Sequence, residues 1–82
     1  MAAARETLVI VDGLLAELRP KPRVAFVLHV LEGYSIDEVA AIVNASISAV
    51  KVRIHDARRR IEKRLKQRPG LVTSLLTGGG NS

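Results

Sequence analysis

Apolar residues recur along this chain at the spacing of one face of an α-helix, in four separate stretches. These stretches predict helices at about residues 4–17, 20–32, 36–43 and 47–67. The residues expected to face inward are Leu8, Val11, Leu15 and Leu18 in the first helix and Val24, Val27, Leu28 and Leu31 in the second. The pattern therefore predicts an all-α fold.

Residues that start and stop helices stand between the apolar stretches. Pro20 suits the first turn of the second helix, where its missing N–H is not needed, and Gly33 is well placed to end that helix. Ser35 is followed three residues later by Glu38, which matches the capping box at the start of a helix. The inner face of this third helix is expected to consist of Ile36, Val39, Ala40 and Val43.

Only a short turn separates the third helix from the fourth. Asn44 ends the third helix, and asparagine is the residue after glycine that best tolerates a left-handed backbone. Ser46 can then cap the fourth helix. A small residue at Ala40, a reversal at Asn44 and an inward valine at Val50 are together typical of a helix-turn-helix. The sequence thus predicts a four-helix helix-turn-helix domain over residues 1–70.

The fourth helix combines a narrow apolar stripe with a basic exterior. The stripe consists of Val50, Ile54, Ala57, Ile61 and Leu65. The basic residues on its exposed sides are Lys51, Arg53, Arg58, Arg59, Arg60, Lys63, Arg64 and Lys66. Pro69 and Gly70 stop the helix. We expect residues 71–82 to form a tail, apolar over residues 71–76, where it adds a turn or contacts a partner, and then disordered.

Charge is divided unevenly along the chain. Residues 1–50 carry four Lys or Arg against six Asp or Glu, whereas residues 51–82 carry nine against two. A basic C-terminal part on a nearly neutral body suits a polyanion such as nucleic acid. The start of the fourth helix, projecting outward, would fit a major groove about 12 Å wide.

Composition argues against several other classes of protein. The chain has no cysteine, and His29 and His55 have no second ligand at zinc-like spacing, so neither a disulfide nor a metal site is expected. No catalytic arrangement, cofactor site or small-molecule substrate site is apparent, so we do not expect an enzyme. No segment reaches the roughly 18–20 apolar residues of a membrane span, and residues 1–5 lack the order of a secretion signal. We therefore expect a cytoplasmic protein without membrane contact.

Three runs of the sequence resemble region 4 of bacterial sigma factors. Residues 18–28 are similar to its L-P-P-R-Q-R-E-V-F-x-L opening, and residues 32–40 are similar to its E-G-L-S-Y-E-E-I-A run. Residues 46–58 resemble its S-x-G-T-V-K-S-R-L-H-R-A-R run, and the three runs align without gaps. The most similar subgroup is the small extracytoplasmic-function type.

The resemblance implies a domain that binds promoter DNA. Such domains dock on the core of RNA polymerase and bind the promoter −35 element. The residues that would bind DNA are Ser46, Ser48, Ala49, Lys51, Val52, Arg53, His55, Asp56, Arg58, Arg59 and Arg23. Lys51 and Arg53 can reach phosphates or guanine edges, and the methyl groups of Ala49 and Val52 can touch thymine. The phosphate clamps would be Arg23, Arg58 and Arg59.

The chain departs from the family pattern at a few positions. Asp56 stands where the family usually carries an arginine; its carboxylate would repel phosphates but could accept a hydrogen bond from a cytosine amine. The other departures are Arg19 for proline, Asn44 for glycine and Ala49 for threonine. These departures leave the target sequence and the DNA affinity open.

Two other functions stay open at this point. One is a protein-interaction module that mainly binds an anti-sigma factor or RNA polymerase, which Asp56 and the apolar Leu71, Leu75 and Leu76 favour. The other is a LuxR-type output domain of a response regulator, although such domains usually lack the run formed by Arg53, His55, Ala57 and Arg58. Because residues 1–17 do not provide the second region of a sigma factor, we expect an excised domain rather than a free-standing protein.

Overall fold

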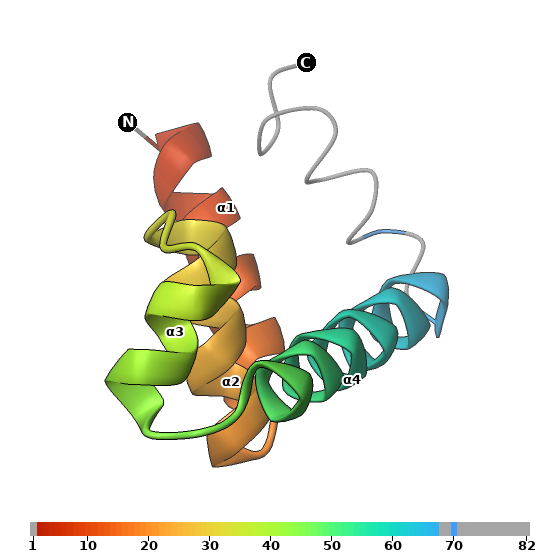
Figure 1. Cartoon of the computed structure of the whole chain (residues 1–82). Coiled ribbons are helices and arrows are strands. Elements are labelled where there is room, and N and C mark those ends of the chain that lie inside the picture. The colour runs from red at the N-terminus through yellow and green to blue at the C-terminus, as the bar shows by residue number, and fades with distance from the viewer. Residues whose placement is uncertain (1, 68–69, 71–82) are drawn as a thin grey trace. The chain divides into compact units, whose positions relative to one another are not determined.

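A computed structural model describes residues 2–67 and 70, with side chains from Val9 onward. It contains four α-helices, which are α1 (Ala2–Ala16), α2 (Pro20–Phe26), α3 (Ile36–Val43) and α4 (Ile47–Gln67) (Figure 1). A π-helical segment, η1 (Val27–Leu31), continues α2. The predicted all-α helix-turn-helix class is confirmed. The tail predicted for residues 71–82 lies outside the described residues.

The chain forms two compact units. The first unit comprises Met1–Glu17 and Ile61–Ser82, and the second comprises Leu18–Arg60. In the first unit, Nε of Arg64 on α4 donates to Oε2 of Glu17, just after α1, at 3.0 Å. Both side chains are about one-third exposed or more, so this ion pair contributes at most about 1 kcal/mol. In the described part of the chain, no helix has the length and apolar character needed to cross a bilayer.

The buried face of α1 differs slightly from the predicted one. Leu14, which was not among the residues expected to face inward, is only 7% exposed, whereas Val11 and Leu15 are half-buried. Leu18 is buried but follows the end of the helix. Leu14 lies three residues after Val11, so it belongs to the same helical face, and the centre of that face passes through Leu14.

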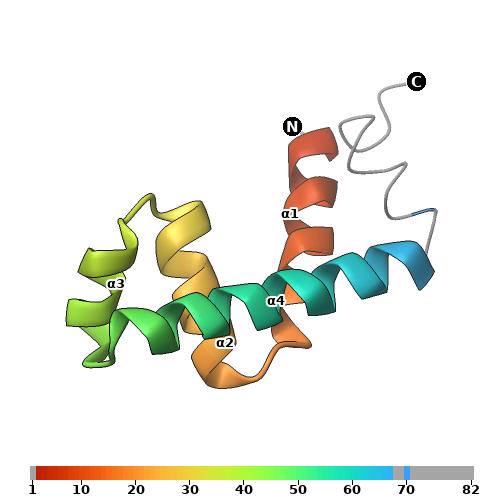
Figure 2. The same ribbon diagram turned by 45° about the vertical axis from the view of Figure 1, so that its right-hand side comes forward.

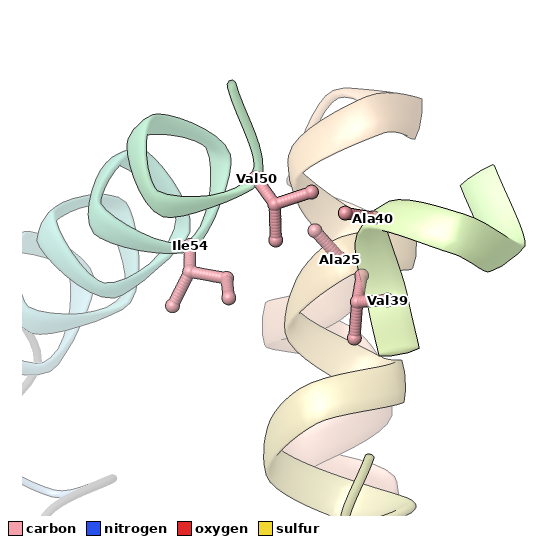
Figure 3. Packing of buried hydrophobic residues seen from close by; sticks show 5 residues of the cluster. All are labelled: Ala25, Val39, Ala40, Val50 and Ile54. Carbon is pink, nitrogen blue, oxygen red and sulfur yellow. The ribbon is translucent and has the colours of Figure 1, made fainter. Parts of the chain in front are cut away.

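The core of the second unit is a cluster of small and branched apolar residues from three helices. Its members are Ala25 on α2, Val39 and Ala40 on α3, and Val50 and Ile54 on α4 (Figure 3). Val39 and Val50 are fully buried, and each contributes roughly 1.5–3 kcal/mol through burial. The two alanines present only methyl groups, so the helices can approach closely. Ile36 and Val43, also predicted to face inward, pack against the cluster.

The inward face of α2 and η1 was predicted only in part: Leu28 packs against the core, but Val24 and Leu31 do not face inward. Val24 is 45% exposed and Leu31 is 52% exposed, whereas Ala25 is fully buried. Ala25 takes the inward position as a member of the buried cluster that α2, α3 and α4 share. In η1 the hydrogen bonds span five residues, as between the N–H of Glu32 and the carbonyl of Val27 at 2.9 Å. This wider turn rotates Leu31 away from the face on which Leu28 packs.

Specific hydrogen bonds at the helix ends fix the path from η1 to α3. Gly33 has φ of 82°, and the adjacent carbonyl of Tyr34 accepts a hydrogen bond from Nδ1 of His29 at 2.7 Å. The N–H of Glu38 donates to Oγ of Ser35 at 3.1 Å, and the N–H of Ser35 donates to Oε1 of Glu38 at 2.9 Å. Hydrogen bonds to the Glu38 carboxylate from the backbone N–H of Ser35 and, to a smaller extent, from its side chain lower the pKa of Glu38 below its ordinary value. The predicted glycine stop and capping box are confirmed.

Candidate nucleic-acid interface

The turn between α3 and α4 is three residues long and depends on Asn44. This residue has φ of 54° and ψ of 52°, in the left-handed region. The N–H of Ala45 donates to the carbonyl of Ala40 at 3.0 Å, and the N–H of Asn44 donates to the carbonyl of Ala41 at 3.4 Å. This pair of hydrogen bonds is the Schellman arrangement, and Ala45 packs against the core as that arrangement favours. The predicted left-handed turn is therefore confirmed.

Replacing Asn44 with alanine is expected to lower the free energy of unfolding by about 1 kcal/mol. The reason is that a β-carbon in the left-handed region approaches the following carbonyl too closely, a contact that asparagine tolerates better. Replacement with glycine, which adopts positive φ freely, should leave the free energy of unfolding within about 0.5 kcal/mol of the wild-type value. Urea unfolding followed by circular dichroism measures both variants. Equal losses in the two variants would show that the left-handed backbone does not limit the stability of the turn.

Ser46 caps α4 on the other side of the turn. Its Oγ accepts a hydrogen bond from the N–H of Ala49 at 3.0 Å, and its carbonyl accepts one from the N–H of Val50, also at 3.0 Å. The first N–H groups of a helix lack intrahelical partners and carry partial positive charge, so they favour a nearby anion such as a phosphate. The predicted cap is confirmed, and it orients the start of α4 relative to α3.

Opposite sides of α4 differ in burial. The apolar stripe is buried at Val50, Ile54 and Ala57, and it is half-buried further along at Ile61 and Leu65. The helix runs without interruption from Ile47 to Gln67 (Figure 2). Because one side packs against the core, the residues on the other side of its first turns are free to meet a ligand.

Ten of the eleven residues predicted to bind DNA lie on α4 or at its cap. The exposed ones are Ser46, Ser48, Lys51, Val52, His55, Asp56, Arg58 and Arg59. The half-buried ones are Ala49 and Arg53 on α4, and Arg23, which comes from α2. The structure thus gathers all but Arg23 on one helix, and none of them is buried.

Charge is polarised within the second unit. Residues 46–60 contain five Lys or Arg and one Asp, whereas residues 24–45 contain three acidic residues and no Lys or Arg. The acidic residues are Glu32, Asp37 and Glu38, all exposed. A phosphate backbone would therefore meet attractive charge along α4 and repulsive charge on α3 and at Glu32, just after η1.

The sequence patterns did not single out Ile47 as an exposed residue at the start of α4. Ile47, the first residue of α4, is 43% exposed. It precedes Val50 by three residues, so helical spacing alone would turn it inward. However, a helical side chain leans toward the N-terminus and covers the preceding turn, and the first residue has no preceding turn to cover. Its position at the start of the helix was the signal that could have identified it as exposed.

The short turn, the buried cluster that α3 and α4 share and the basic exposed side of α4 define a helix-turn-helix protein of the DNA-binding class. A family model described as sigma-70, region 4, matches residues 8–61, about two-thirds of the chain. The chain therefore belongs to the sigma-70 region 4 family, as its three sequence runs indicated. This is a family of DNA-binding transcription domains rather than of enzymes. No curated protein and no solved structure gave a significant match.

Proposed function

We propose that this domain binds the promoter −35 element as part of an extracytoplasmic-function sigma factor, docked on the core of RNA polymerase in the cytoplasm. The observation that carries the proposal is the capped, left-handed turn that leaves the basic side of α4 exposed. An α-helix with its side chains is about 10–12 Å across and fits a major groove about 12 Å wide. In this arrangement the exposed residues of α4 contact bases and phosphates, and Arg23 on α2 adds a phosphate contact.

An NMR titration of the 82-residue chain with a mixed-sequence DNA duplex tests the proposal. At low salt we expect shift changes concentrated in residues 46–60 and at Arg23. These changes should fade as the salt concentration rises, because binding through phosphate contacts releases counterions. No shift changes at low salt would contradict DNA binding by this domain.

A second candidate function is protein interaction with weak or no DNA contact. It is favoured by the exposed apolar residues at the end of η1, which are Val30 at 41%, Leu31 at 52% and Tyr34 at 40%. They lie close in sequence to exposed Glu32, so this surface suits a protein partner better than a polyanion. An anti-sigma factor or RNA polymerase itself would be the partner. If DNA causes no shift changes in the same NMR experiment, this surface is the first to test for binding of a protein partner.

A further inference from the structure

The exposed side of α4 has a central row that lies opposite the buried stripe. Successive residues of an α-helix are rotated by about 100° around the axis. Val52, two residues after the fully buried Val50, therefore lies about 200° from it, almost on the opposite side. Ser48, Asp56 and Arg59 lie within about 40° of the direction of Val52. These four residues, all exposed, form the central row.

Basic residues border the central row on both sides. Lys51 lies about 100° from Val52 in one direction and Arg53 about 100° in the other. Each is followed seven residues later, two helical turns away and on nearly the same side, by an arginine: Arg58 follows Lys51, and Arg60 follows Arg53. The two basic flanks therefore run parallel to the central row over the same part of the helix.

This arrangement assigns different tasks to the flanks and to the central row. When α4 lies in a major groove with the central row toward the bases, the two flanks face the two phosphate walls. Contacts to phosphates hold a protein in register but carry no sequence information. Discrimination between bases must then come from the central row and its immediate neighbours.

Val52 has an unusual combination of position and chemistry. Its side chain is 59% exposed, the largest value for any large apolar residue of the second unit. A β-branched residue is a weaker helix former than alanine or lysine, so neither packing nor helix propensity explains valine here. The side chain of valine cannot form hydrogen bonds, and placing it against a hydrogen-bond donor or acceptor of a base would leave that group without a partner. The C5 methyl group of thymine is the feature of the major groove that an aliphatic side chain matches.

We infer that Val52 determines specificity by contacting the C5 methyl group of one thymine in the DNA target. This inference rests on the proposed function and deepens it, because it names the base and the atom that are recognised. Ala49, the other candidate for a methyl contact, is half-buried and about 60° from Val52, toward the Arg53 flank. Of these two candidates for a methyl contact, Val52 therefore faces the bases more directly.

The test compares thymine with deoxyuridine, which lacks only the C5 methyl group. The 82-residue chain first selects its preferred duplexes from a random pool, and each thymine of a selected duplex is then replaced in turn. At one thymine, the wild-type chain should bind the deoxyuridine duplex about fourfold more weakly, the ratio that corresponds to about 0.8 kcal/mol for one buried methyl-sized group. Val52→Ala should bind the original duplex more weakly and should no longer distinguish the two bases at that position.

Val24→Ala is the matched control. It removes the same atoms from an exposed valine on α2, and it should keep the wild-type affinity and the wild-type response to deoxyuridine. The inference is overturned if the wild-type chain tolerates deoxyuridine at every thymine, or if Val52→Ala still distinguishes the two bases. If the wild-type chain binds no duplex even at low salt, the proposed function itself fails, so the two failures are distinguishable.

Discussion

The double variant with Lys51→Ala and Arg53→Ala is expected to bind every DNA duplex about fiftyfold more weakly than the wild-type chain at roughly 0.1 M salt. Each of the two side chains lies on one basic flank of α4, so the variant removes one phosphate contact from each wall of the groove. A phosphate contact contributes about 0.9 to the slope of log affinity against log salt concentration, so the slope should fall by about 2. Fluorescence anisotropy of a labelled duplex at several salt concentrations measures both quantities.

A matched variant separates local contacts from the loss of overall charge. Lys63→Ala with Lys66→Ala removes the same charge from exposed positions further along α4. It should lower the affinity much less and leave the salt slope nearly unchanged. Alanine is the strongest helix former, so the circular dichroism of both variants should match the wild-type spectrum. Unchanged affinity in the Lys51 and Arg53 variant would mean that the start of α4 does not carry the contact.

The sequence was sufficient to predict the helix-turn-helix itself. The residues that build it act locally: Ser35 and Glu38 bond to each other's backbone, and Asn44 adopts the conformation it tolerates better than most residues. Such features depend on a few neighbouring residues, so they can be identified without knowing what packs nearby. The same holds for the buried side of α4, where Val50 and Ile54 repeat at helical spacing.

The inward face of the second helix could be predicted only in part. Periodicity favours large apolar residues as the core, and it therefore selected Val24 and Leu31. The structure instead buries Ala25, whose value lies in its small size beside Val50 and becomes apparent only when both helices are in place (Figure 3). The π-helical turn of η1 likewise changes the helical register, which a fixed period of 3.6 residues cannot anticipate.

For the candidate interface, the sequence proposed one helix and its residues as candidates, and the structure shows in which direction each candidate lies. Lys51, Val52 and Arg53 are adjacent in sequence and were first grouped together as candidates for contact. Knowing that Val50 is fully buried fixes the rotation of α4, which sends the three side chains in three different directions. The division between phosphate contact and base contact follows from that rotation and not from residue type alone.

Replacing Asp56 with arginine is expected to strengthen binding to mixed-sequence duplexes by about tenfold and to increase the salt slope by about 1. The exposed carboxylate lies among the basic residues of α4 and opposes their attraction to phosphates. The same substitution should lower stability by several tenths of a kcal/mol, because Arg53, Arg59 and Arg60 occupy neighbouring positions three or four residues away. Anisotropy should thus show a higher DNA affinity, whereas urea unfolding should show a lower free energy of unfolding.

Glu32→Arg is the control for Asp56→Arg, since it gives the same change in net charge at an exposed residue outside α4. It should strengthen binding much less, because a charge acts mainly within about 10 Å at 0.1 M salt. A different result for Asp56→Arg would reveal that Asp56 contacts a base. Asp56 lies about 40° from Val52, nearer to the bases than to a phosphate wall, where a carboxylate can accept a hydrogen bond from a cytosine amine. If Asp56→Arg weakens binding to the preferred duplex while strengthening binding to others, Asp56 contributes to specificity at the cost of overall affinity.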